Sequence, residues 1–566
     1  MSRRDSTSGP LRSLPVAEAV VVAVVACALA VATTWPLVLL LDDHAHDSFD
    51  PLFQAWTIDW VQHALGSDAP LWDANTFLGH RRTLAYSDAL LGAAVALLPF
   101  RWLGLSPIGV QNVGVLLGYA SSGVAGYVFG RVVSRRVLVA ACCGVVFGFG
   151  TYNTFLGQHM NIAIHPGPAL AAAAVWVTAD RRAGGRGLAP GLVPLVGVVA
   201  AQGTISFYTC ALSLVAAAAV AVARARALGA KGVAAVAAAL AAGVALLIPI
   251  ASPYLRNAAD LPDDFSWPLR DLAVSGADFT AVDPSLTLWG ATLGAPTGIF
   301  GQPTFPGVAI LVLAVVGLLT WRRSDRRLHV LALTLIAIGF VLAVGASDTG
   351  WRRYTPYRLL YEHVPGGDAL RATGRFWLVG LLGVGVLVGL GVSRLAELVS
   401  AGRRPRRWAG AGVATLCLGA GLFEGHRSWA DAVPVEISAV DRALGELPGP
   451  GGVAYLPLPT SRRQPFPLLG QAEIVYGSTA HHRPIVNGYA GFYPEDFFTA
   501  GAPLLGLPDR RSLDHLRRVG VRYLVVPEEA GDWQALRDPA AAAPLELVGD
   551  FDGDLLYEVV PDDPTR

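Results

Sequence analysis

The sequence is poor in charge and in cysteine, and it lacks the common nucleotide-binding motifs. Only 15% of the 566 residues are Asp, Glu, Lys or Arg, well below the roughly 25% of soluble domains. The five cysteines, Cys27, Cys142, Cys143, Cys210 and Cys417, all fall inside apolar runs, so neither disulfides nor structural zinc are expected. A Walker loop, a Gly-x-Gly-x-x-Gly after a strand and a soluble basic patch are also missing, which argues against nucleotides and nucleic acid as partners.

Long hydrophobic runs take the place of these features. Hydrophobic residues make up 53% of the chain, and runs of the roughly 17–25 residues that cross a bilayer recur from Val16 to Phe423. Eleven membrane spans are predicted. They are approximately 16–41, 108–130, 137–152, 162–179, 188–206, 207–223, 232–252, 304–321, 328–345, 374–394 and 408–424. The first run is too long for a signal-peptide core, so it is predicted to stay in the protein as a helix.

The arginines predict how the spans are oriented. Every second gap between the runs is strongly basic. These gaps hold Arg3/Arg4/Arg12, Arg131/Arg135/Arg136, Arg181/Arg182/Arg186, Arg224/Arg226/Lys231, Arg322/Arg323/Arg326/Arg327 and Arg403/Arg404/Arg406/Arg407. The positive-inside rule places these gaps and the N-terminus in the cytoplasm. We therefore predict a multi-pass protein of the cytoplasmic membrane, with any chemistry on its outer face. Its richness in arginine and alanine is typical of a high-GC bacterium.

Three outer segments are too long to be turns, namely 42–107, 253–303 and 346–373. In the first of them, Asp50 to Leu65 has helical spacing and is predicted to lie in the membrane interface, anchored by its tryptophans. Asp88 to Leu105 is predicted to be a re-entrant or juxtamembrane helix. The whole of 1–424 is thus interpreted as one transmembrane domain.

The tail is predicted to be a separate domain. Hydrophobic runs stop after Phe423, and 425–566 is about the size of a single domain. Alternating stretches predict strands at 452–458, 521–526, 545–551 and 555–560, and helical patterns cover 435–447 and 512–519. The predicted fold class is therefore a polytopic α-helical membrane protein with a C-terminal extracytoplasmic α/β domain.

Candidate chemistry is concentrated just after the first span. Asp42-Asp43-His44-Ala45-His46-Asp47-Ser48-Phe49-Asp50-Pro51 holds four carboxylates and two histidines. Such a cluster can bind a divalent cation through oxygen ligands or hold one carboxylate as a general base. A solvated helix end is the alternative that the residues leave open. A carboxylate near apolar lipid is expected to have a raised pKa.

Several motifs share the order found in a known family. They are Asp50-Pro51-Leu52-Phe53-Gln54-Ala55-Trp56, Thr83 to Gly92, Gly157-Gln158-His159, Leu370 to Phe376 and Arg483 to Tyr489. Over most of its length the chain resembles the bacterial membrane glycosyltransferases of GT-C type. The resemblance implies transfer of a sugar from a polyprenyl-phosphate donor at the outer leaflet. The acceptor would be a glycan, lipid or protein of the envelope.

The resemblance also implies roles for three aspartates. In such enzymes an acidic residue of the first outer loop deprotonates the acceptor hydroxyl, and Asp50 matches best, with Asp47 second. Where relatives tend to carry Glu-His before Leu-Leu-Gly, this chain has Ser87-Asp88, so Asp88 becomes the second acidic position. Its expected role is metal binding or orientation of the acceptor. Mg²⁺ or Mn²⁺ at Asp47, Asp50 or Asp88 is permitted but not required.

A phosphate-linked donor needs cationic partners. Arg371 and Arg375 are four residues apart at the outer end of the tenth span, and we expect them on one helical face. Arginine binds phosphate in a bidentate manner, although an arginine at this depth can also serve lipid headgroups. His80, with Arg81 and Arg82 beside it, is a further candidate for substrate contact.

Polar residues near other span ends are candidates of a second kind. His159 and His165 flank the outer ends of the third and fourth spans, and either can be a functional group or a satisfied structural histidine. Glu362-His363 could face the same site. In the tail, 481–483 and 487–489 are interpreted either as a ligand-contacting loop or as a buried polar turn.

Three functions remain open at this point. The first is a lipid-linked sugar transferase. The second is a transporter or flippase for a lipid-linked substrate, against which stand the absence of acidic residues deep within the spans and the lack of inverted repeats. The third is an envelope scaffold that has kept the architecture and lost the reaction.

Overall fold

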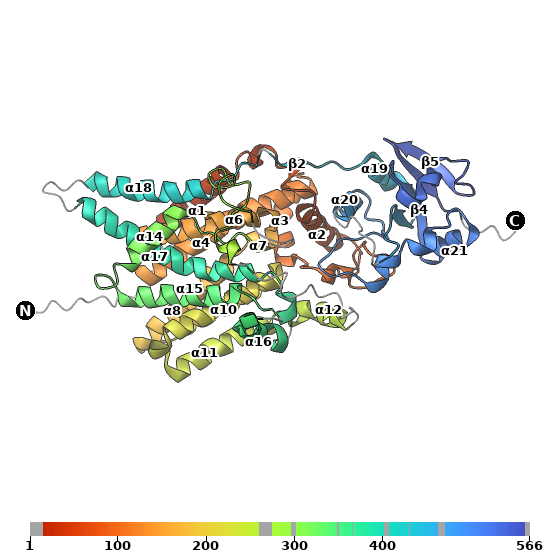
Figure 1. Ribbon diagram of the computed structural model, residues 1–566. Coiled ribbons are helices and arrows are strands. Elements are labelled where there is room, and N and C mark those ends of the chain that lie inside the picture. The colour runs from red at the N-terminus through yellow and green to blue at the C-terminus, as the bar shows by residue number, and fades with distance from the viewer. Residues whose placement is uncertain are drawn as a thin grey trace, which may run out of the picture.

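The structure is a computed structural model that describes residues 15–259, 274, 276–295, 302–347, 350–364, 366–400, 407–429, 431–461 and 470–560. Within these ranges most residues are helical (Figure 1). The helices form a bundle on one side of the molecule, and the strands β3–β6 lie on the other side, beyond α2 and α20.

The bundle is built from apolar helices. Within the described ranges, six are long and apolar enough to cross a membrane: α1 (Val16–Thr33), α4 (Pro107–Ser134), Met160–Ala183 with α8 (Pro166–Ala183), α11 (Ala225–Ala245), α15 (Arg326–Ala343) and Thr373–Ser400 with α17 (Trp377–Ser400). Shorter apolar helices are α3 (Leu91–Trp102), α5 (Val137–Phe149), α9 (Ala189–Ile205), α10 (Phe207–Ala223), α14 (Val308–Leu318) and α18 (Arg407–Glu424). Each predicted run coincides with one of these helices, and α3 is the additional one. The protein is therefore a mostly helical, multi-pass membrane protein, and the number of eleven crossings stays a prediction.

Glycines set the close packing of neighbouring helices. A Cβ added at Gly126 of α4 would lie 2.7 Å from the carbonyl oxygen of Cys143 in α5. A Cβ at Gly317 of α14 would overlap the carbonyl oxygen of Leu387 in α17. Backbones approach this closely only where side chains are absent, which is the usual way in which helices pack tightly in lipid.

The two ends of the bundle differ in charge. At one end, Arg131 in the last turn of α4 pairs with Glu18 in the first turn of α1, at 2.8 Å. At the other end, the backbone N–H of Ser106, which caps the start of α4, donates to Asp42 at 2.7 Å. Because α4 runs between these contacts, the basic gap after α4 and the acidic segment after α1 lie at opposite ends. Which end faces the cytoplasm stays a prediction.

Helix α2 (Asp50–Leu65) has the predicted bounds but a different environment. Every residue from Pro51 to Gln62 is buried. The indole N–H of Trp56 donates to Asn75 at 2.9 Å, and that of Trp60 donates to the carbonyl of Leu71 at 3.0 Å. The tryptophans of α2 are therefore bonded inside the protein and do not serve as membrane anchors, and the position of the helix at the membrane interface stays a prediction. Helical spacing indicated one buried face, but α20 (Gly470–Gly477), from the tail, packs on α2 together with α3 and α4.

The tail contains a four-stranded sheet with strand order β3-β4-β6-β5. The strands are β3 (Gly452–Tyr455), β4 (Val521–Val526), β5 (Glu546–Phe551) and β6 (Asp554–Glu558), with β3 and β4 parallel and the other pairs antiparallel. Helix α19 (Ala439–Glu446) precedes β3 in the sequence, and α21 (Arg510–Arg518) lies between β3 and β4. The strands and helices predicted for the tail are thus present. Whether the tail is an independent domain is not tested by this arrangement.

The tail is joined to the first outer segment by backbone hydrogen bonds. The N–H of Phe77 donates to the carbonyl of Asn487 at 3.0 Å, and the N–H of Ile485 donates to that of Asn75 at 2.6 Å. The strands β1 (His44–Ala45) and β2 (Val433–Pro434) add a second, antiparallel contact. The chain before the second span and the chain after the last span therefore form one layer over that end of the bundle.

A buried carboxylate strengthens the same junction. Asp59 of α2, whose side chain is only 4% exposed, lies 2.8 Å from Nε2 of His482 and 3.3 Å from a guanidinium nitrogen of Arg101 in α3. The ring of His63 stacks on that of His482 with centroids 3.9 Å apart. This contact holds the tail against α2 and so helps to position the site described next.

Candidate active site

Asp50 is the first residue of α2, and the local sequence fixes it there. Asp47 accepts a hydrogen bond from the backbone N–H of Phe49 at 2.9 Å, which turns the chain into the helix. Pro51 occupies the first turn, where its missing N–H costs nothing. A carboxylate in the first turn is also favoured by the positive end of the helix dipole.

Two side chains from distant parts of the sequence contact Asp50. One carboxylate oxygen lies 2.8 Å from Nε2 of His159, in the connection between α5 and α8. The other accepts a hydrogen bond from the hydroxyl of Tyr489, in the tail, at 2.8 Å. The Asp50 side chain is 31% exposed. The structure thus brings two predicted residues, Asp50 and His159, into direct contact and adds a tyrosine to them.

The pKa of Asp50 is lowered, which corrects the expectation of a raised value. Burial does raise this pKa, but the charge and hydrogen bond of His159, the hydrogen bond of Tyr489 and the charge of Arg375 together outweigh it. The sequence argument considered only removal from water and could not include partners that arrive from elsewhere in the chain. Asp50 is therefore ionised at neutral pH.

Arg371 and Arg375 do not share one face of an α-helix, so that expectation is wrong. Arg375 lies in a short 3₁₀ helix, Thr373–Phe376, and α17 begins only at Trp377. The hydroxyl of Tyr208 donates to the carbonyls of Leu370 at 3.2 Å and Ala372 at 2.5 Å. These two hydrogen bonds hold the chain around Arg371 in an irregular conformation that is not α-helical.

Both arginines nevertheless have unused hydrogen-bonding capacity. Nη2 of Arg371 donates to the carbonyl of Gly491 at 3.0 Å, while its Nη1 is buried without a hydrogen-bond partner in the described part of the chain. Nε of Arg375 is likewise buried with no partner in the described ranges, and its guanidinium lies 4.9 Å from the ring centre of Tyr208. Among the described residues neither arginine forms an ion pair with a carboxylate. Buried guanidinium N–H groups without acceptors are suited to an anionic ligand.

Asp88 is held on the opposite side of the connection that carries His159. It accepts hydrogen bonds from the amide of Asn161 at 2.8 Å and from the hydroxyl of Ser206 at 2.7 Å. Asp88 is therefore linked to the Asp50 site through 159–161 rather than by direct contact. Sequence reasoning missed Ser206; the available signal was a polar residue at the point where two predicted spans meet without a gap.

Asp47 belongs to a second polar cluster. It lies 3.0 Å from Nδ1 of His46, whose other ring nitrogen contacts Arg427. Arg427 in turn lies 3.8 Å from Asp283. This cluster joins the first outer segment to the chain after α18, and the catalytic role of Asp47 stays a prediction.

The carboxylates do not converge on a common metal position. Within the described ranges, no group of three or more His, Cys, Asp or Glu side chains is arranged to hold a metal ion. Asp47, Asp50 and Asp88 each turn to different partners. The donor set therefore does not fit a shared Mg²⁺ or Mn²⁺ site.

The other candidates near the span ends do not contact Asp50 in the described hydrogen bonds and ion pairs. His165 is buried between the carbonyls of Ile162 and Phe147, at 2.9 and 3.1 Å, as a structural histidine. Glu362 and His363 are exposed, and Glu362 pairs with Arg358.

The tail segment 487–489 combines both interpretations given for it. Asn487 is a buried group that bonds the backbone of Tyr455 at 2.9 and 3.0 Å, whereas Tyr489 reaches Asp50. His80 lies farther out, in a polar cleft, 3.2 Å from Asp496.

Comparison with known proteins gives similarity in structure only. No protein-family model matches the chain, and no curated protein matches it. Among solved structures, the archaeal oligosaccharyltransferase AglB from Archaeoglobus fulgidus, in complex with an inhibitory peptide and a dolichol-phosphate, is 12% identical, with a TM-score of 0.47 over 90% of this chain and 69% of that one. ArnT from Cupriavidus metallidurans is 12% identical, with a TM-score of 0.46 over 96% and 98%. The arabinofuranosyltransferase AftD from Mycobacteria is 14% identical, with a TM-score of 0.49 over 98% of this chain and 42% of that one.

These three solved structures are membrane glycosyltransferases of GT-C type, the family that the motifs of this chain resemble. Each of the three TM-scores is below 0.5.

Proposed function

We propose that this chain is an integral membrane glycosyltransferase that acts on the outer face of the cytoplasmic membrane. It transfers a sugar from a polyprenyl-phosphate donor to a hydroxyl group of an envelope acceptor. One observation supports this above all. At one end of an apolar helix bundle, an ionised carboxylate, Asp50, is gathered with two arginines, Arg371 and Arg375, each with a buried N–H group that has no acceptor in the part of the chain that the structure describes.

In this proposal Asp50 is the general base. The acceptor oxygen attacks the anomeric carbon, its proton passes to Asp50, and the bond between the sugar and the donor phosphate breaks. His159 and Tyr489 each occupy one lone-pair direction of the carboxylate, which leaves further lone pairs for the acceptor hydroxyl. Because a lowered pKa makes Asp50 a weak base, the proton moves late, when the attacking oxygen has become acidic.

Arg371 and Arg375 would bind the donor phosphate. The leaving phosphate gains negative charge as the glycosidic bond breaks, and fixed cations stabilise that charge without reorganisation. Nη1 of Arg371 and Nε of Arg375 supply donors that have no acceptor among the described residues. The charge of Arg375 also lowers the pKa of Asp50, so the phosphate and base positions are electrostatically coupled.

The test is transfer of radiolabelled sugar from a panel of polyprenyl-phosphate donors, in membranes that contain the full chain. We expect label in lipid or polymer with the wild type, none with Asp50→Asn, and wild-type transfer with Asp68→Asn, a matched change at an exposed residue near the other end of α2. Transfer that survives in Asp50→Asn refutes Asp50 as the base. No transfer with any donor refutes the enzyme and favours movement of a lipid-linked substrate or a scaffold.

A further inference from the structure

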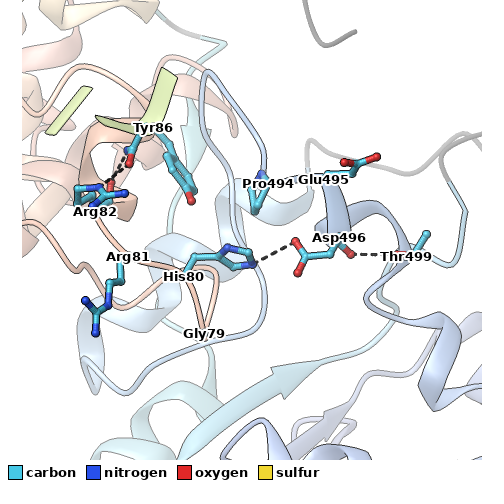
Figure 2. A pocket seen from close by; sticks show the side chains of 10 residues that line it. Gly79, His80, Arg81, Arg82, Tyr86, Pro494, Glu495, Asp496 and Thr499 are labelled. Atoms are coloured by element: carbon cyan, nitrogen blue, oxygen red, sulfur yellow. Dashed lines mark hydrogen bonds and ion pairs between the residues drawn. The ribbon is translucent and has the colours of Figure 1, made fainter. Parts of the chain in front are cut away.

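A polar cleft lies between the first outer segment and the tail. Its volume is about 840 Å³, within the roughly 300–1,000 Å³ of typical ligand sites. Gly79–Arg82 and Tyr86 form one wall, 494–496 with Thr499 form the other, and Asn257 of α12 (Ile248–Ala258) completes it. Figure 2 shows His80 reaching from the first wall toward Asp496 on the second.

The walls are fixed by the core beneath them. Phe77 and Tyr86, from the first outer segment, pack with Tyr493 and Phe497, from the tail, in one buried aromatic cluster. Ring centres of Phe77 and Phe497 are 5.2 Å apart, and those of Phe77 and Tyr493 are 5.8 Å apart. The two walls are thus parts of one packed unit, and the cleft between them is formed in advance of any ligand.

One residue that lines the cleft is held in a costly backbone conformation. Arg82 has φ of 55°, in the left-handed region that non-glycine residues rarely adopt. Arg82 is locked there by a reciprocal pair of bonds with Asn257, at 2.8 and 3.0 Å, and by Asp73, which accepts from its N–H at 2.7 Å. Strain that the surroundings hold in place gathers at ligand sites.

The lining favours a neutral ligand rich in hydroxyl groups. Arg81 and Arg82 are balanced by Glu495 and Asp496, so the cleft offers donors and acceptors with little net charge. The hydrogen bond from His80 lowers the pKa of Asp496 and keeps it an acceptor. Among the described residues that line the cleft there is no leucine, isoleucine, valine or methionine. A lining without these aliphatic side chains is unsuited to a polyprenyl chain.

A peptide fits the cleft less well than a glycan. Peptides often bind by adding a strand to the edge of a sheet, but the lining residues lie in loops, 3₁₀ turns and α12, and none of them belongs to a strand. Tyr86 supplies a single aromatic group among charged and amide side chains. Side-chain donors and acceptors around one aromatic residue suit the hydroxyls and ring faces of sugars.

One tail segment connects the cleft to the Asp50 site. In 489–494, Tyr489 donates to Asp50, the carbonyl of Gly491 accepts from Arg371, and Pro494 lines the cleft. The N–H of Phe492 donates to the carbonyl of Tyr86 at 3.0 Å, which anchors this segment to the opposite wall. The cleft and the Asp50 site are therefore joined by one continuous segment of the tail.

We propose that this cleft binds the carbohydrate chain of the acceptor, so that the acceptor is a glycan whose non-reacting sugars occupy the space between 79–82 and 494–499. This inference rests on the proposed glycosyltransferase function and narrows it. The reacting hydroxyl would lie at Asp50 and the donor phosphate at the two arginines. The cleft then contributes to the affinity for the acceptor alone.

The test fills the cleft with a bulky side chain. Thr499, exposed on the wall, is changed to tryptophan, and Leu505→Trp places the same side chain at an exposed tail position outside the cleft. With the full chain in nanodiscs, transfer is measured with synthetic glycan acceptors of one to five sugars. We expect Thr499→Trp to raise KM for the longer acceptors about tenfold or more, with the KM for the donor unchanged, and Leu505→Trp to act as wild type.

Three results would overturn the inference while leaving the enzyme intact. The first is a KM for the acceptor that Thr499→Trp leaves unchanged. The second is a KM for the donor that Thr499→Trp raises instead. The third is transfer to peptides but not to glycans. Absence of transfer by the wild type would contradict the proposed function instead. In that case the cleft is tested by binding of the same glycans, measured by saturation-transfer NMR. The inference about the cleft is overturned if the glycans do not bind, or if they bind equally well to Thr499→Trp.

Discussion

The pair formed by Asp50 and His159 predicts a defect that depends on pH. In His159→Gln the carboxylate loses both the charge and the hydrogen bond of the imidazole, which are the two largest influences that lower the pKa of Asp50. That pKa therefore rises. A carboxyl with a lowered pKa keeps its charge above that pKa and loses it as the pH falls through it. The variant should lose its base at a higher pH than the wild type does.

The size of the defect follows from the contact. Hydrogen bonds to charged groups contribute about 1.5–3 kcal/mol, and about 1.4 kcal/mol corresponds to a tenfold change in an ionisation constant. On the acidic side, where both proteins are mostly protonated, the rate follows the ionised fraction. We therefore expect kcat/KM of His159→Gln to be about 10- to 100-fold below the wild type in acid. Toward alkaline pH the two rates should converge.

The assay is the pH profile of sugar transfer by the full chain at limiting acceptor. His44→Gln is the matched control, because His44 pairs with Asp43 at 2.7 Å on the same outer segment, away from Asp50. Tyr489→Phe removes one hydrogen bond and no charge, so its acidic defect should be smaller than that of His159→Gln. A defect of His159→Gln that is equal at every pH would show that His159 does not act through the ionisation of Asp50.

Three further predictions concern the donor, the tail and the bundle. Arg375→Ala should raise the donor KM about tenfold or more, because a buried cation with an unused N–H is removed; kinetics with varied donor measure this. Asp59→Asn should lower the stability by about 2 kcal/mol, because the charged bond to His482 at 2.8 Å is lost, as thermal unfolding in detergent would report. Gly126→Ala should destabilise the bundle by about 1–3 kcal/mol, because its Cβ meets the Cys143 carbonyl at 2.7 Å.

Each of these three substitutions has a control substitution elsewhere in the chain. Arg353→Ala, at an exposed arginine of the same outer segment, should leave the donor KM unchanged. Asp68→Asn, at an exposed aspartate after α2, should not affect unfolding. Gly412→Ala is expected to be harmless, since a Cβ there meets nothing within 4 Å. If a variant and its control behave alike, the contact assigned to that residue is wrong.

The helices and strands could be predicted because their causes are local. A run of apolar residues long enough to cross lipid has to satisfy its own backbone as a helix, and each of the predicted runs overlaps an apolar helix of the structure. The alternating stretch 521–526 is likewise strand β4 with the same bounds. Composition and periodicity act over tens of residues, so the sequence carries them directly.

The environment of the site could not be predicted in the same way, because it depends on contacts distant in the sequence. Tyr489 lies 439 positions from Asp50, and it is this partner, with His159, that reverses the expected direction of the pKa shift. The irregular segment around Arg371 has a similar origin, since Tyr208 of α10 captures two of its carbonyls. No local spacing encodes either contact.

The tail therefore completes the site and does not merely cover it. Its segment 489–494 donates to the base through Tyr489, supports one cation through the carbonyl of Gly491 and forms part of the acceptor cleft at Pro494. Movement of this segment would change the pKa of Asp50, the position of Arg371 and the width of the cleft together. An acceptor seated in the cleft would hold all three in place, so acceptor binding and readiness of the base are expected to be coupled through the tail.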